Sequence, residues 1–339
     1  MKPRQFAAFV APSVLMMLAL MALPLVMTVW LSLRSCNPVM EQVRVQQSGP
    51  FGSQEVLTQQ ARVGDDGKPL EQCAWVGGAY YRKVLGLDAT ADRPDQRPDE
   101  RPDERLDTGA PPNEFWVALR FTLIYVAATT PFILLIGLGL ALGVNRLTQR
   151  LKSLFITAAL LPFILTPLVG ALAIKWLFRD DGLVSALLAG AGLHIHWMAQ
   201  ASTAQLLIVL YGIWHVAPFA FIVLYAGLQS VSKDALEAAS IDGATRWQLL
   251  RFVTLPHLMP LMVFIMLIHL MDAYRVFEPV LVLTQGAFTT SVQYLTYHIL
   301  LNEANPYKAS AAAVLTLAGI AVLLVPLLVK TWREQRAGQ

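Results

Sequence analysis

Three charged residues interrupt a long apolar stretch in the second half of the chain: Asp272, Arg275 and Glu278. A spacing of three residues places them on one side of a helix, where neighbouring members can form ion pairs. An unpaired charge at the centre of a lipid bilayer costs about 2.5 kcal/mol or more, so we expect these side chains to face protein or water. Two roles stay open. One is a polar wall of a solute path, which would include Tyr274; the other is a self-neutralised ion network that orients the helix.

Aromatic residues offer a second kind of binding chemistry in another apolar stretch. Tyr211, Trp214 and Phe221 share one side of a helix, and sugars stack on aromatic faces. Pro218 lies among them and can kink the helix, which blurs this alignment. Because tryptophan and tyrosine near span ends more often form an interfacial belt, both a sugar-binding platform and a belt are consistent with the sequence.

A polar stretch between two apolar runs has the pattern of a helix-turn-helix. Ser232 can cap a first helix, and Gly243 suits the position just after its last residue. Thr245 can cap a second helix, with Gln248 three residues on to complete a capping box. Pro256 is expected to end that helix, since the residue before a proline is disfavoured in the helical conformation. The hairpin is too polar to enter lipid.

This hairpin resembles the EAA loop of binding-protein-dependent ABC importer permeases, in its glutamate, its glycine and the later Leu-Pro pair. The resemblance implies that the loop docks in a cleft of a separate ATPase subunit and moves with it. The residues implied in this contact are Glu237, Ala238, Ala239, Asp242, Gly243, Ala244, Arg246 and Trp247. The alternative is an ordinary loop between two spans.

Other segments resemble the carbohydrate-importer permeases of the maltose or glycerol-3-phosphate type. They are residues 75–85, 115–123, 282–291 and 305–311. The chain departs from that pattern at Tyr80, Arg120, Phe121, Ala287 and Phe288. The resemblance implies a sugar or sugar-like solute, an extracytoplasmic solute-binding protein that delivers it, a second permease subunit and two ATPase subunits.

No pattern for ATP hydrolysis occurs in the sequence. The nearest string to a G-x-x-x-x-G-K-[ST] phosphate-binding loop runs from Gly64 to Lys68, and Pro69 follows it. The chain also lacks H-E-x-x-H, C-x-x-C and G-x-S-x-G. We therefore expect no enzyme activity, no catalytic residue, no metal site and no bound cofactor in this chain. ATP and magnesium would be used by a partner subunit.

Composition identifies the elements that position these residues. Of 339 residues, 55% are hydrophobic and only 14% are charged, whereas soluble proteins carry about a quarter charged residues. Apolar stretches of about 20 residues cross a bilayer as helices, because lipid offers the backbone no hydrogen-bond partners. We predict an all-α polytopic membrane protein with six spans, at residues 8–33, 121–144, 154–174, 203–229, 258–283 and 310–329.

Lysine and arginine concentrate in alternate short loops between these spans. The positive-inside rule then places both termini and the loop at residues 231–260 in the cytoplasm. The resemblance to the importer permeases implies that the membrane is a bacterial inner membrane. Three parts follow: an anchor helix at 1–33, an extracytoplasmic insert at 34–114 and a permease core at 115–339.

The insert is partly of low complexity. Residues 93–108 repeat arginine, proline and aspartate, which predicts a solvated spacer. Cys36 and Cys73 both fall on the outer, oxidising side, where a disulfide is favoured. Two separate thiols are the alternative.

The resemblance thus implies a permease that works by alternating access, and nothing in the sequence indicates nucleic-acid binding. A rival is a proton-coupled secondary carrier with Asp272, Arg275 and Glu278 as its relay. The repeated halves common in such carriers are not evident. A membrane anchor or sensor built on the insert is a further rival, which the low complexity of the insert disfavours.

Overall fold

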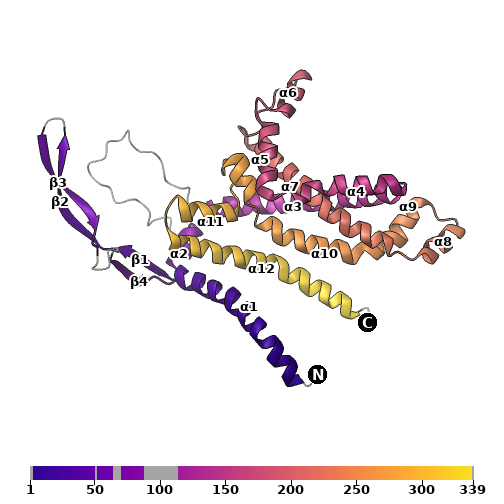
Figure 1. Ribbon diagram of the computed structural model, residues 1–339, viewed down its shortest axis with the longest axis horizontal. Helices are drawn as coiled ribbons and strands as arrows, with labels where there is room; N and C mark the ends of the chain where they lie inside the picture. The colour runs from indigo at the N-terminus through magenta and orange to yellow at the C-terminus, as the bar shows by residue number, and fades with distance from the viewer. Residues whose placement is uncertain (1–2, 50–51, 64–69, 88–113, 338–339) are drawn as a thin grey trace. The chain divides into compact units, whose positions relative to one another are not determined.

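A computed structural model describes the chain over residues 3–49, 52–63, 70–87 and 114–337. The chain divides into two compact units. The amino-terminal unit comprises residues 1–112 and 296–315, and the core unit comprises residues 113–295 and 316–339. Figure 1 shows the helices and strands of both.

Five helices in the described part of the chain are long and apolar enough to span a membrane, and a bent helix pair makes six if it counts as one span. This confirms the all-α, multi-spanning class. The long helices are α1 (Pro3–Ser32), α3 (Glu114–Asn145), α7 (Ala201–Gln229), α10 (Leu255–Tyr274) and α12 (Pro306–Ala337). The bent pair joins α4 (Gln149–Ile164) to α5 (Pro167–Phe178) and α6 (Leu183–Gly190).

The predicted third span, residues 154–174, is not one straight helix. The two halves of the bent pair meet at 97°. Leu165 and Thr166 are extended between them, with ψ angles of 136° and 144°. The cause is Pro167, because a proline pushes the residue before it out of the helical region while fitting well as the first residue of a new helix.

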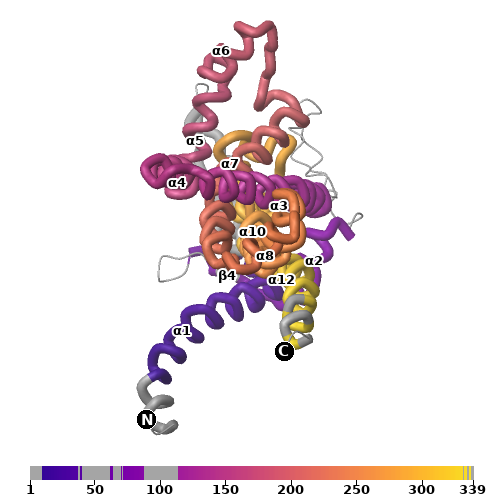
Figure 2. The backbone as a smooth tube through the Cα atoms, turned by 90° about the vertical axis from the view of Figure 1, so that its right-hand side faces the viewer, coloured from indigo at the N-terminus to yellow at the C-terminus, as the bar shows by residue number. Residues whose placement is uncertain are grey.

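Small residues let the central helices of the core unit approach closely. A methyl group added to Gly137 of α3 would lie 2.7 Å from the Cβ of Ala220 on α7. Gly212 of α7 lies against the ring of Tyr125 on α3 in the same way. Figures 1 and 2 show α3 and α7 side by side, and α10 packs against both. The pairing follows the rule that small residues set close helix approach in membranes.

Short elements connect α7 to α10. They are α8 (Lys233–Ile241), α9 (Arg246–Gln248) and the π-helical turn η2 (Leu249–Thr254). Figure 1 shows α8 and α9 together at one end of the core unit, beyond the ends of α7 and α10, and Figure 2 looks onto that end.

The predicted fifth span, residues 258–283, stops short. α10 ends at Tyr274, and Arg275 leaves the helix with φ −99° and ψ 23°. A second π-helical turn, η3 (Val280–Thr284), follows, and the φ of Gln285 after it is 51°. The helix α11 (Val292–Leu301), which was not among the predicted spans, comes next. The break places Asp272 and Glu278 on different segments.

The amino-terminal unit adds two antiparallel two-stranded sheets to the helical chain. β1 (Arg34–Pro38) pairs with β4 (Glu71–Trp75), and β2 (Met40–Gly49) pairs with β3 (Gly52–Ala61). The helix α2 (Ala79–Val84) follows. The insert is therefore more ordered than a spacer in these parts, while the repeats at 93–108 lie outside the described residues.

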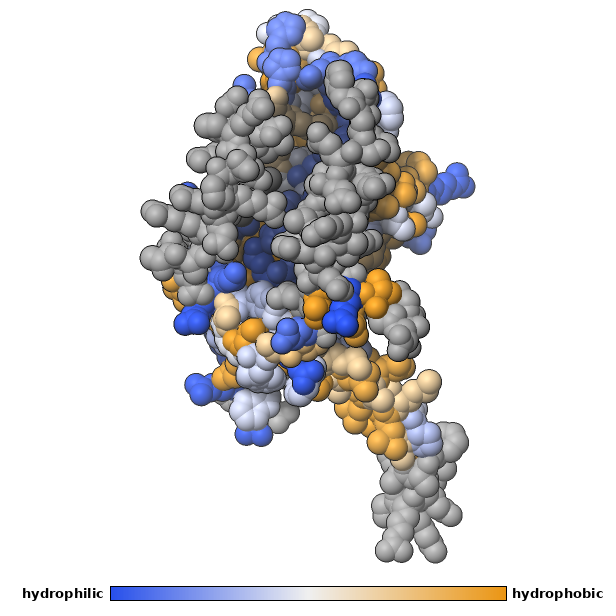
Figure 3. Space-filling view, turned by 90° about the vertical axis from the view of Figure 1, so that its left-hand side faces the viewer, coloured by the Kyte–Doolittle hydropathy of each residue, from blue (hydrophilic) through white to orange (hydrophobic). Residues whose placement is uncertain are grey.

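The membrane-length window of α1 buries none of its residues within this chain. Figure 3 shows its apolar side chains in orange along the helix. Leu15, Met16 and Leu20 are each about two-thirds exposed, at 66%, 67% and 67%. Such a surface is stable only in lipid or against another apolar protein surface.

Candidate functional site

The hairpin between α7 and α10 begins with a capped helix. Ser232 Oγ accepts a hydrogen bond of 3.3 Å from the backbone N–H of Ala235 at the start of α8. At its end, Gly243 has a φ of +81° and the N–H of Ala244 donates to the carbonyl of Ala239 at 3.0 Å. This is the glycine-ended Schellman turn, which an L side chain at the glycine position would strain. The predicted start and end of this helix are confirmed.

The second helix of the hairpin carries the predicted capping box. The backbone N–H of Thr245 donates to Gln248 Oε1 at 2.7 Å. In return, the backbone N–H of Gln248 donates to Thr245 Oγ1 at 3.4 Å. These bonds satisfy N–H groups that a helix start would otherwise leave without partners.

The prediction that Pro256 ends this second helix is wrong. One helix runs from Arg246 to Tyr274, through α9, η2 and α10. Within it, the N–H of Leu255 reaches back to the carbonyl of Leu250, the five-residue bond of a π-helix. Because this wider turn comes just before Pro256, the missing N–H of the proline falls in the first turn of α10, where it is tolerated. The second helix of the hairpin is therefore continuous with a helix long enough to span the membrane.

The hairpin exposes large apolar side chains that the sequence reasoning mostly missed. Ile241, Trp247 and Phe252 are 86%, 65% and 68% exposed. Only Trp247 was predicted as a contact. The sequence signal for Ile241 and Phe252 was their apolar character in an otherwise polar segment. Exposed aromatic and aliphatic residues on a water-facing hairpin are typical of a protein-binding surface.

The charged residues of the hairpin are also available for binding. Glu237, Asp242 and Arg246 are exposed, and none of the ion pairs in the described part of the chain includes them. Ala238 and Ala239 between them leave room for a partner's side chains. A pocket of about 300 Å³ lies in the turn itself, lined by Ala239, Asp242, Gly243, Ala244, Gln248 and Phe252.

The charged residues of the fifth span lie around the end of α10. Asp272 and Arg275 are exposed within this chain, and Glu278 is half-buried. No ion pair within 4.0 Å joins them in the described residues, so the predicted pairing does not form. The helix break after Tyr274 is the reason, since the three no longer follow one helical spiral. Their charges are left to face water, a solute or another subunit.

A hydrogen-bonded segment follows these charges, and little in the sequence indicated it. Lys175 Nζ donates to the carbonyl of Val282 at 2.7 Å. The backbone N–H of Val292 donates to Thr122 Oγ1 at 3.1 Å, in the buried interior. Polar side chains from α5 and α3 thus bond to the π-helical turn η3 and to the first residue of α11. The only signal was a lysine and a threonine at the ends of apolar stretches.

The predicted aromatic platform is not formed as expected. Phe221 is fully buried (0% exposed), and Tyr211, at 3%, donates its hydroxyl hydrogen bond to the carbonyl of Pro167 at 2.7 Å. Tyr274 is buried as well, at 1%. Only Trp214 keeps an accessible ring, at 38%. Helical spacing alone did not predict that α5 accepts the hydrogen bond of Tyr211 or that α3 and α10 pack against α7.

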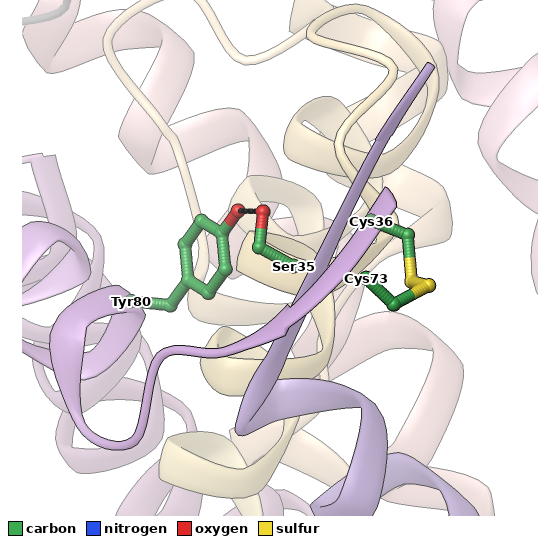
Figure 4. Close-up of a disulfide and its surroundings, with 4 residues drawn as sticks. All are labelled: Ser35, Cys36, Cys73 and Tyr80. Carbon is green, nitrogen blue, oxygen red and sulfur yellow. Dashed lines mark hydrogen bonds between the residues drawn. A yellow bond between two sulfur atoms is a disulfide. The ribbon is translucent and has the colours of Figure 1, made fainter. Parts of the chain in front are cut away.

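Cys36 and Cys73 lie opposite each other on β1 and β4 and form a disulfide (Figure 4). Beside them, the hydroxyl of Tyr80 donates to Ser35 Oγ at 2.8 Å. Tyr80 is a position where the sequence departs from the carbohydrate-permease pattern, and here it has a structural partner. The disulfide links β1, which follows α1, to β4, so these two strands of the insert are joined covalently.

The described residues hold no group of three or more histidine, cysteine, aspartate or glutamate side chains that could bind a metal ion. What the structure defines is a multi-spanning helical membrane protein whose exposed hairpin extends directly from one of its spans.

Comparison with known proteins places this architecture in a family. Residues 118–339 match the family described as binding-protein-dependent transport system inner membrane component. The chain belongs to this family. The trehalose transport system permease protein SugA of Mycobacterium tuberculosis (strain ATCC 25618 / H37Rv) is 33% identical over 213 residues, which is 62% of this chain and 67% of SugA. Among curated relatives, the match covers from 61% to 79% of their length.

Solved structures agree with the fold. A bacterial ABC transporter involved in the import of the acidic polysaccharide alginate has a chain with a TM-score of 0.60 and 25% identity, covering 65% of this chain and 79% of that one. A bacterial alginate ABC transporter in complex with alginate pentasaccharide-bound periplasmic protein matches with a TM-score of 0.58 and 26% identity, covering 63% of this chain and 77% of that one.

Proposed function

We propose that this chain is the permease subunit of an ATP-driven importer and moves a sugar or sugar-like solute through the membrane by alternating access. The observation that carries the proposal is the single helix from Arg246 to Tyr274. One end of it bears the exposed hairpin, and the other end bears Asp272. A movement imposed on the hairpin is therefore passed to the charged end without a flexible joint.

The partner that moves the hairpin would be an ATPase subunit. The chain has no phosphate-binding loop, so ATP and magnesium would be bound by that partner. Ile241, Trp247 and Phe252 supply apolar anchors for its cleft, and Glu237 and Asp242 supply polar contacts at the rim. Two ATPase subunits and a second permease subunit complete the proposed assembly, with α1 as a surface available to lipid or to that second permease.

The solute would come from an extracytoplasmic binding protein. Support comes from the relatives, since SugA belongs to a trehalose transport system and the similar solved structures belong to alginate importers, one of them in complex with its periplasmic protein. Within this chain, Trp214 offers an accessible ring and Asp272 and Arg275 offer exposed polar groups, the two kinds of contact that carbohydrates use. We place the chain in a bacterial inner membrane, with both termini and the hairpin in the cytoplasm.

Cross-linking tests the proposed coupling contact. In the complex with its ATPase, an Ile241→Cys variant should form a cross-link to an introduced cysteine in the ATPase cleft. Leu187→Cys on α6 is the matched control, because Leu187 is also exposed, at 68%. Equal cross-linking at both positions, or none at Ile241, would refute the coupling site.

Reconstitution tests the class of transporter. Proteoliposomes that contain the chain with its second permease subunit, its ATPase and its binding protein should take up solute only when ATP is present. The rival, a proton-coupled carrier, predicts uptake driven by a pH gradient with this chain alone. Uptake under that second condition would overturn the proposal.

A further inference from the structure

A pocket of about 230 Å³ lies where the ends of α3 and α7 meet the hairpin, separate from the pocket in the turn. Its walls combine residues from both spans with residues from α8, α9 and η2. The apolar part includes Leu142 of α3, Leu228 of α7 and Leu236 of α8. The polar part includes Asn145, Arg146 and Arg246.

The polar lining of this pocket is rich in hydrogen-bond donors, and the hydroxyl of Thr254, which also lines it, can donate or accept. Its two charged residues are both arginines, and no carboxylate lines it. Arg146 and Arg246 take part in none of the ion pairs formed within the described residues. The side-chain oxygen of Asn145 accepts a hydrogen bond from Gln229 at 2.9 Å, which turns its remaining amide group, a donor, to other partners. This set is suited to an anion.

The position and the apolar walls narrow the class of anion. Asn145 and Gln229 are the last residues of α3 and α7, so the pocket opens at the ends of two membrane-spanning helices. Leu142 and Leu228, one turn or less inside those ends, offer an apolar surface that a free inorganic anion would not use. A molecule with an anionic head and an apolar body satisfies both parts.

We propose that this pocket binds the headgroup of an acidic phospholipid, with Arg146 and Arg246 on its phosphate and with the first methylene groups of its chains against Leu142 and Leu228. Arginine suits this role because its planar guanidinium pairs with phosphate through two hydrogen bonds. The bound lipid touches α3, α7 and the hairpin together. It therefore ties the hairpin to the two spans that precede it.

Lipid retention by the whole purified transporter tests the proposal. The complex is extracted from bilayers of phosphatidylcholine mixed with phosphatidylglycerol, and bound lipids are counted by native mass spectrometry. We expect phosphatidylglycerol to be retained in preference to phosphatidylcholine. Arg146→Gln should weaken this retention about fivefold, the loss expected for one basic side chain at an anionic lipid. The matched control is Arg150→Gln, which removes an equal charge from an exposed position on α4 outside the pocket.

Each result has a defined meaning. Loss of phosphatidylglycerol in Arg146→Gln but not in Arg150→Gln, with both complexes eluting as intact assemblies, supports the site. Equal loss in both variants means general attraction to charge and overturns it. Equal retention of the two lipids also overturns it. Displacement of the lipid by inorganic phosphate at matched concentration would assign the pocket to a free anion instead.

Discussion

The hydroxyl of Ser230 lies 3.0 Å from Nε2 of His257, so the residue after α7 is hydrogen-bonded to the first turn of α10. Ser230 also donates its one proton to the carbonyl of Gly227 at 2.8 Å. It therefore accepts from His257, whose Nε2 carries the hydrogen. The bond closes the base of the hairpin and joins its two sides where they leave the spans.

Removal of this bond should loosen the hairpin. Ser230→Ala deletes this bond together with the local bond to Gly227. Loss of the bond to His257, worth about 1 kcal/mol, corresponds to about fivefold faster amide exchange in α8 if local opening controls the rate. Hydrogen–deuterium exchange of the purified complex measures the effect. Thr157→Ala is the control, since it removes a comparable exposed side-chain bond, to Ser153, on α4. Unchanged exchange in α8 would show that the base is held by packing alone.

Gly243 should be sensitive to side chains that cannot adopt its conformation. Its φ of +81° costs an L residue about 1–2 kcal/mol, and asparagine tolerates this region best. No atom lies within 4 Å of an added Cβ, so strain rather than collision sets the effect. Gly243→Asp should lower the solute transported per ATP hydrolysed, and Gly243→Asn should retain more of it.

The test of that prediction is the ratio of uptake to ATP hydrolysis in proteoliposomes. Full solute-stimulated ATP hydrolysis together with full uptake in Gly243→Asp would contradict a coupling role for the turn. If Gly243→Asn fails as severely as Gly243→Asp, the left-handed backbone is not the cause.

The two helices of the hairpin could be predicted from sequence because helix-capping residues act locally. Ser232, Gly243 and the pair Thr245 and Gln248 each act on backbone groups within a few residues, and all three caps form. Pro256 misled the prediction for a related reason. A proline breaks a regular α-helix, but the π-helical turn before it shifts the hydrogen bonds by one residue and lets the helix continue.

Other features depend on tertiary contacts that hydropathy does not encode. The stretch at 154–174 is apolar throughout, yet Pro167 divides it. Phe221 and Trp214 are both large aromatic residues on α7, and the neighbouring helices decide which ring is covered. The strands around Cys36 were hidden because short exposed strands leave little periodic pattern.

The charges near the end of α10 should matter for transport more than for assembly. Asp272 is exposed and makes no ion pair within the described residues, so Asp272→Asn removes no internal bond. We expect uptake to fall while the yield of assembled complex is unchanged, and Glu278→Gln to behave likewise. Asp181→Asn is the control, since Asp181 is exposed and pairs only locally with Arg179 at 2.8 Å.

Uptake kinetics and complex yield together decide that prediction. Normal uptake in Asp272→Asn and Glu278→Gln removes these residues from the solute path. A parallel fall in complex yield would instead favour the structural ion network, with pairing partners supplied by another subunit.

The contact of Gly212 with Tyr125 sets the distance between α7 and α3 and should limit stability. A Cβ on Gly212 would overlap the hydroxyl of Tyr125 and come within 2.9 Å of its ring carbon. Both residues are buried, so neither can move into solvent. Overpacking of this kind costs about 1–3 kcal/mol, and Gly212→Ala should lower the thermal midpoint of the detergent-solubilised protein.

The control is Gly139→Ala, since Gly139 lies on α3, as Tyr125 does, and no atom lies within 4 Å of a Cβ added there. This variant should leave the thermal midpoint unchanged or raise it, because alanine favours the helical conformation. Since the hydroxyl is the nearest atom, adding Tyr125→Phe to Gly212→Ala should recover part of the loss. An unchanged midpoint in Gly212→Ala would mean that the two helices can separate without penalty.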